Sequence, residues 1–107
     1  MKPRIYLDNA ATTPMLCEAV LAMSPYYIDC FYNPSSRYDK AYDVSNVIKT
    51  CREKISKTIN CRPEEIYFTS GGSESDNWAL RCAKQGDHII TSKIEHHAIL
   101  NTCKYLE

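Results

Sequence analysis

The stretch FTSGGSESDN, Phe68–Asn77, places two glycines among hydroxyl-bearing and acidic residues, directly after a short apolar run. The whole chain has only three glycines, so two of them fall at this one point. Glycine lets a backbone turn tightly or approach a ligand closely. The stretch therefore predicts either a tight turn or a cradle for a phosphate, at the start of a helix.

Alternating strands and helices are predicted around this stretch. The β-branched and aromatic run Ile66–Thr69 predicts a buried strand before the glycines, and a helix is predicted to run through Trp78 to Cys82 after them. A second strand, His88–Thr91, and a last helix over residues 99–106 follow. This order favours an α/β fold with parallel strands, in a sheet that two strands leave incomplete.

Upstream of the glycines the chain is predicted to be helical. An apolar stripe over residues 16–27 indicates a short helix that Pro25 limits. A longer stripe over residues 41–59 indicates a helix of about five turns. That helix is expected to end at Asn60, and Pro63 closes the connection.

These elements suggest one partial domain over residues 1–107, which is small for an independent core. It is expected to have three parts: an extended segment over about residues 1–15, a helical region over 16–60 and the start of a larger α/β domain over 61–107.

The composition excludes several classes of protein. Lys plus Arg and Asp plus Glu number thirteen each, so neither a nucleic-acid partner nor an acidic tail is expected. No segment resembles a secretory signal or a membrane span. Six cysteines lie ten to twenty-one residues apart without a C-x-x-C pair, which favours buried thiols in a reducing cytoplasm over disulfides or a metal site.

The glycine turn has two chemical interpretations. A helix start leaves backbone N–H groups without partners and carries a partial positive charge, so Ser70–Ser73 would suit a phosphate. Alternatively, Ser73 is an N-cap, with Asp76 forming a capping-box-like pair. Both can hold, because one hydroxyl can donate to a phosphate while it accepts from an N–H.

A second candidate site is Glu95-His96-His97, just after the second predicted strand. In open parallel sheets ligands bind beyond the carboxyl ends of the strands, so this stretch and the glycine turn are expected to converge. His96 could then stack on a flat cofactor or relay protons, or it could simply cap the last helix at the surface. A zinc site on His96 and His97 is not expected, because adjacent residues rarely aim at one metal.

Four blocks, in this order, carry a family resemblance: YLDNAATTP (Tyr6–Pro14), NPSS (Asn33–Ser36), FTSGGSESDN, and the stretch from IITS to EHHA (Ile89–Ala98). With them the whole chain resembles the N-terminal part of a cysteine desulfurase, in the class V aminotransferase family of pyridoxal 5'-phosphate (PLP) enzymes. The resemblance implies a fold-type-I PLP-dependent transferase, with residues 61–107 beginning its large PLP-binding domain.

The resemblance also implies roles for individual residues. Gly72 and Ser73 match the positions that hold the PLP phosphate, where family members usually carry Ala-Thr. His96 matches the catalytic residue that stacks over the PLP ring and helps proton transfers. His97 matches a variable position, and Asn9–Thr13 matches a segment close to the active site.

This chain departs from the family pattern in three places: Tyr32 stands where a glycine is usual, Asp39 stands where a histidine is usual, and the connection Cys82–His88 is short. These departures are expected to affect local loops and substrate selection. No residue matches the family's cofactor-binding lysine, its aspartate, its substrate-binding arginine or its reactive cysteine. None of the six cysteines is therefore expected to accept sulfur.

The implied activity is conversion of L-cysteine to L-alanine, with sulfur passing to an enzyme cysteine as a persulfide for iron–sulfur cluster assembly or other sulfur delivery. Implied partners are a sulfur-acceptor protein and a second copy in a homodimer. As an N-terminal fragment, the 107-residue chain is expected to be nearly inactive alone. Two alternatives remain: another class V enzyme such as a selenocysteine lyase, and a non-catalytic binding or dimerisation module.

Overall fold

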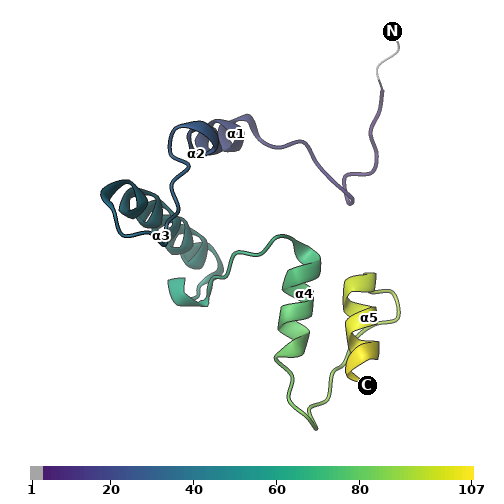
Figure 1. Ribbon diagram of the computed structural model, residues 1–107. Helices are drawn as coiled ribbons and strands as arrows, with labels where there is room; N and C mark the ends of the chain where they lie inside the picture. Colours follow the sequence, from purple (N-terminus) through teal and green to yellow (C-terminus); the bar gives the residue numbers. More distant parts are fainter. Residues whose placement is uncertain (1–3) are drawn as a thin grey trace. The chain divides into compact units, whose positions relative to one another are not determined.

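The computed structural model describes residues 4–107, which form helices joined by turns and extended segments (Figure 1). The chain divides into two units between Pro63 and Glu64. The division falls inside a single turn of 3₁₀ helix, η1, Pro63–Glu65. Among the described residues, no helix combines the length and the apolar character needed to span a membrane.

The first unit contains α1 (Cys17–Met23), α2 (Pro25–Ile28) and α3 (Asp39–Ile59). The single helix predicted over residues 16–27 is in fact two, because Pro25 is the first residue of α2. A proline is tolerated there, since the first N–H of a helix has no intrahelical partner.

The long helix α3 is confirmed, and so is its end. Asn60 has the left-handed conformation, with φ 55° and ψ 51°, and its N–H donates to the Ser56 carbonyl. The Cys61 N–H donates to the same carbonyl over 2.9 Å. Asparagine tolerates this conformation better than most residues, which explains why the helix stops here.

The second unit is built on α4 (Gly72–Arg81) and α5 (His97–Leu106), which pack against each other. The two helices run in the same direction, so both begin at the same end of the pair (Figure 1). At their far ends the Arg81 guanidinium lies 4.9 Å from the centre of the Tyr105 ring. Midway along both helices the Thr102 hydroxyl donates to Asn77 Oδ1, so side-chain contacts join the helices at more than one level.

The predicted strands Ile66–Thr69 and His88–Thr91 have no regular secondary structure, and neither forms a β-ladder in the described part of the chain. A strand is stabilised by a neighbour that pairs with its backbone and covers its side chains. Here Phe68 is 53% exposed and Ile90 is 92% exposed. The helices that were predicted after each of these segments are present as α4 and α5, while the strands and the parallel α/β sheet stay a prediction.

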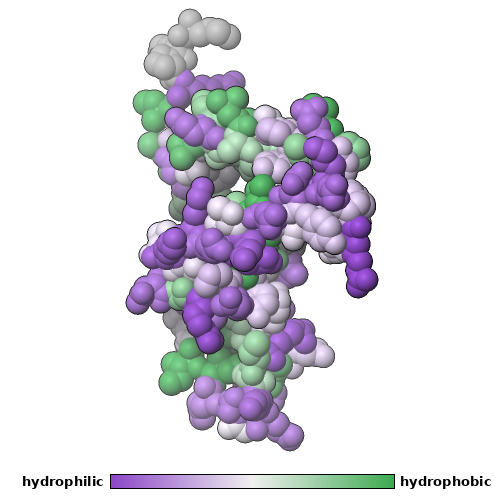
Figure 2. Space-filling model, turned by 90° about the vertical axis from the view of Figure 1, so that its left-hand side faces the viewer, coloured by the Kyte–Doolittle hydropathy of each residue, from purple (hydrophilic) through white to green (hydrophobic). Residues whose placement is uncertain are grey.

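Few hydrophobic side chains are covered. The prediction of buried thiols is wrong for this structure, because three of the six cysteines are exposed and the other three are only partly covered. Among residues 4–107, Ala41 is the only hydrophobic residue that is buried, and large apolar side chains reach the surface on both units. Figure 2 shows such hydrophobic side chains, in green, between hydrophilic ones.

Candidate cofactor-binding site

The two glycines that open the site are not required by the fold of this chain. Gly71 is the N-cap of α4 and has an extended φ of 162°, and Gly72, the first residue of the helix, does not have a positive φ. A Cβ atom built on either glycine would meet no heavy atom within 4 Å. By contrast, Gly86 has φ 93°, which L residues rarely adopt. A tight turn therefore explains Gly86 but does not account for Gly71 and Gly72.

The start of α4 offers hydrogen-bond donors. In the described part of the chain, neither the N–H groups of Gly72 and Ser73 nor the Ser73 hydroxyl has a hydrogen-bond partner. The first bond of the helix runs from the Ser75 N–H to the Gly71 carbonyl over 3.2 Å. Free donors at the positive end of a helix dipole favour an anion.

The capping alternative for Ser73 is wrong. The N-cap is Gly71, so Ser73 is the second residue of the helix. The carboxylate that reaches back is Glu74 rather than Asp76, and it accepts from the Ser70 N–H over 2.6 Å and from the Ser70 hydroxyl over 2.7 Å. The hydroxyl of Ser73 is therefore not used in capping.

The Glu74 carboxylate holds the loop just before the helix. Its bond from the Ser70 N–H, and then that from the Ser70 hydroxyl, lower the pKa of Glu74 below its ordinary value of 4.5. On the same loop the Thr69 hydroxyl lies 2.7 Å from the Ser75 hydroxyl and 3.2 Å from the Gly71 carbonyl. Sequence reasoning missed Glu74, although an acid three residues after an N-cap is a known sign of a helix start.

His96 is the N-cap of α5. Its Nδ1 accepts from the Ala98 N–H over 3.1 Å, so in the neutral ring the proton is on Nε2. The interpretation of His96 as a surface cap is thus confirmed. The side chain nevertheless remains exposed, which keeps its ring available for a ligand. The neighbouring His97 ring lies 6.3 Å away, centre to centre, and is tilted by 57°.

Gly72 and Ser73 are the first two residues of α4, and His96 is the N-cap of α5, all in the second unit. Both helices begin at the same end of the pair (Figure 1). Asn77 joins the two starts, because its Nδ2 donates to the Ser73 carbonyl over 2.8 Å and reaches the Ala98 carbonyl at 3.5 Å. The segment Asn9–Thr13 belongs to the first unit, where the Ala11 N–H closes a turn by donating to the Asp8 carbonyl over 3.1 Å.

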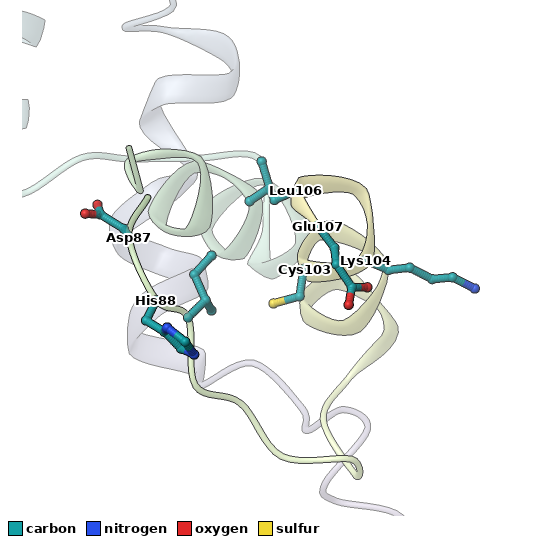
Figure 3. Close-up of a pocket in the computed structure, with 7 residues that line it drawn as sticks. Asp87, His88, Cys103, Lys104, Leu106 and Glu107 are labelled. Carbon is teal, nitrogen blue, oxygen red and sulfur yellow. The ribbon is translucent and has the colours of Figure 1, made fainter. Parts of the chain in front are cut away.

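A separate depression of about 430 Å³ lies near the last turn of α5. Figure 3 shows its lining, with Cys103, Lys104, Leu106 and Glu107 coming from the end of the chain, and Asp87 and His88 from the segment opposite. It contains none of Gly72, Ser73 and His96, so it is not part of the candidate site.

The chain belongs to the class V aminotransferase family, whose model matches residues 5–107. A relative named cysteine desulfurase IscS from Methanosarcina thermophila is 48% identical over 96% of this chain and 27% of its own length. Another protein of that name, from Clostridium botulinum (strain Kyoto / Type A2), is 46% identical over 100% of this chain and 28% of its own. The family resemblance seen in the sequence is therefore confirmed.

Two solved structures are similar to this chain. One, described as a NifS-like protein, has a TM-score of 0.89 and 37% identity, over 97% of this chain and 30% of its own. The other, described as SspA in complex with cysteine, has a TM-score of 0.82 and 41% identity, over 91% of this chain and 29% of its own. This chain therefore spans less than a third of the length of each of these proteins.

Proposed function

We propose that this chain forms the phosphate-binding part of a PLP-dependent cysteine desulfurase. The observation that carries the proposal is the start of α4, where the N–H groups of Gly72 and Ser73 and the Ser73 hydroxyl have no partner in the described chain. His96, which is exposed, is the N-cap of α5, and α4 and α5 begin at the same end of the helix pair. Membership of the class V aminotransferase family, whose enzymes are typically PLP-dependent, supports the cofactor.

The residues present fit a phosphate ester. Gly72 and Ser73 would donate their backbone N–H groups to its oxygens, and the Ser73 hydroxyl would add a third donor. No heavy atom of the chain crowds Gly72, so the backbone there is open to close approach. The Glu74 carboxylate accepts hydrogen bonds from the N–H and the hydroxyl of Ser70, which is the residue before the N-cap.

His96 would stack on the cofactor ring. Its Nδ1 is fixed by the Ala98 N–H, so the ring is oriented and Nε2 is the nitrogen that can exchange a proton with a ligand. When bound, the cofactor supplies an electron sink next to the substrate. His96 is thus proposed both as a cofactor-binding and as a catalytic residue.

The proposed substrate is L-cysteine. Its C–S bond breaks, L-alanine leaves, and the sulfur joins an enzyme thiol as a persulfide that passes to an acceptor protein. Support comes from relatives named cysteine desulfurase and from the similarity to SspA in complex with cysteine. None of the six cysteines of this chain is proposed as the sulfur-accepting thiol, because none matches the reactive cysteine of the family.

We also propose a homodimer in the cytoplasm. Exposed apolar side chains such as Ile90, at 92%, and Ile94, at 94%, favour association, and six free cysteines suit a reducing compartment. Light scattering of the purified chain at high concentration is expected to show self-association. A monomer under those conditions would contradict the dimer.

A chimera tests the proposed activity. In the cysteine desulfurase of Methanosarcina thermophila, the region that this chain matches is replaced by residues 1–107, and alanine release from L-cysteine is measured with added PLP. We expect alanine release that depends on PLP and falls when His96 is replaced by alanine. A folded chimera that binds PLP but leaves L-cysteine unchanged would refute the proposal and favour another class V enzyme.

The chain alone is the matched control for the chimera. It is expected to release almost no alanine, because the lysine and cysteine implied by the family have no counterpart here. Turnover of L-cysteine by the 107-residue chain at the rate of the intact relative would show that this explanation is wrong.

A further inference from the structure

A polar network joins α4 and α5 at a buried position. Thr102 is 4% exposed, and its hydroxyl lies 2.7 Å from Asn77 Oδ1 and 2.8 Å from the Ala98 carbonyl. A hydroxyl has one proton, so it donates to one of these oxygens at a time. Asn77 and Thr102 are twenty-five residues apart, and their bond is a direct tie between the two helices.

The other side of the Asn77 amide reaches both candidate site elements. Its Nδ2 donates to the Ser73 carbonyl over 2.8 Å, in the first turn of α4. The same nitrogen lies 3.5 Å from the Ala98 carbonyl, in the first turn of α5. The Ala98 N–H in turn donates to Nδ1 of His96. A continuous series of hydrogen bonds therefore links Ser73 to the His96 ring.

We propose that Asn77 and Thr102 are positioning residues that set the spacing between the phosphate-binding turn and the His96 ring, so that one cofactor engages both. This inference rests on the proposed PLP site. Two helices held by apolar contacts alone can slide with little loss, whereas the bond between the partly buried Asn77 amide and the buried Thr102 hydroxyl forms well in only one arrangement. The network therefore adds a defined register to the packing of α4 on α5.

The test compares PLP with inorganic phosphate, because phosphate needs only the start of α4 while PLP needs both elements. Both dissociation constants are measured for the 107-residue chain, and their ratio gives the preference for PLP. Thr102→Val keeps the shape of the side chain but removes its hydroxyl. We expect a loss of roughly fivefold in PLP affinity, the scale of one net hydrogen bond. Phosphate affinity should stay unchanged.

Two further variants control the comparison. Thr102→Ser retains the hydroxyl and should keep the wild-type preference for PLP. Asn77→Leu removes the tie between the helices, while the Thr102 hydroxyl keeps its bond to the Ala98 carbonyl at 2.8 Å, so no buried donor is left without a partner. This variant should lose PLP preference like Thr102→Val.

The inference is overturned if Thr102→Val and Asn77→Leu keep the wild-type ratio. It is also overturned if both ligands weaken by the same factor, because that result indicates a general structural role. A wild-type chain that binds PLP no better than phosphate would instead defeat the proposed PLP site, and the inference with it. The two failures are thus distinguished by whether they occur in the wild type or only in the variants.

Discussion

Replacing Ser73 by alanine removes a hydroxyl that has no partner in the described structure. The free energy of unfolding should therefore change by no more than about 0.5 kcal/mol. PLP binding should weaken, because the hydroxyl is proposed to donate to the phosphate. A hydrogen bond to a charged group contributes about 1.5–3 kcal/mol, and the exposure of Ser73 favours the lower figure. That figure corresponds to a loss of about tenfold in affinity.

The assay is an equilibrium titration of PLP, followed by its absorbance, at fixed ionic strength. Ser73→Thr retains a hydroxyl and should bind PLP about as tightly as the wild type. Ser45→Ala, on α3 in the other unit, controls for a serine replacement outside the site. Equal affinity of Ser73→Ala and the wild type would remove Ser73 from the site, and so would equal weakening by Ser73→Ala and Ser73→Thr.

Three further changes have defined outcomes. Gly72→Ala should stabilise the chain by about 0.4–1 kcal/mol in urea unfolding, because its Cβ meets no atom within 4 Å and its φ is not positive; a loss of stability would contradict this. The Ser70 amide resonance should titrate with the pKa of Glu74, below 4.5. Since the pKa of Glu74 is lower in the folded chain, its bonds from Ser70 stabilise the loop fully above the unfolded pKa. This stabilisation is lost as the pH falls through the folded pKa, and Glu74→Gln should abolish the pH dependence. Asn60 ends α3 in the left-handed conformation, so Asn60→Val should lower the free energy of unfolding by about 1–2 kcal/mol, whereas Asn60→Gly should not lower it. Equal stability of the two variants would contradict this prediction.

The helices follow from the sequence because their signals are local. The apolar stripe over residues 41–59 sets the face of α3, and Asn60 ends the helix through its own backbone preference. The exact first residue of α4 was harder to predict from the sequence. Gly71 and Ser73 are both common near helix starts, and only the backbone conformation distinguishes the N-cap from the second helical residue.

The sheet could not be decided from the sequence. Residues 66–69 and 88–91 have the composition of strands, but a ladder requires a neighbouring segment that pairs with them. No such pairing occurs in the part of the chain that the structure describes.

The location of the site was predictable, whereas its internal connections were not. The sequence places Ser73 and His96 each at the start of a helix, and the parallel helix pair brings those starts to one end. The contact between Asn77 and Thr102 depends on how α4 packs on α5, at a separation of twenty-five residues. No periodicity or motif in the sequence marks such a pair.

The central claim is that the start of α4 binds the PLP phosphate while His96 lies against the ring. Titrating PLP into the ¹⁵N-labelled 107-residue chain tests this claim most directly. We expect the largest amide shifts at Gly72 and Ser73, together with ring-current shifts of the His96 side chain. Inorganic phosphate should reproduce the amide shifts without those of His96. Saturable PLP binding that leaves Gly72 and Ser73 unmoved, or no binding at all, would contradict the claim.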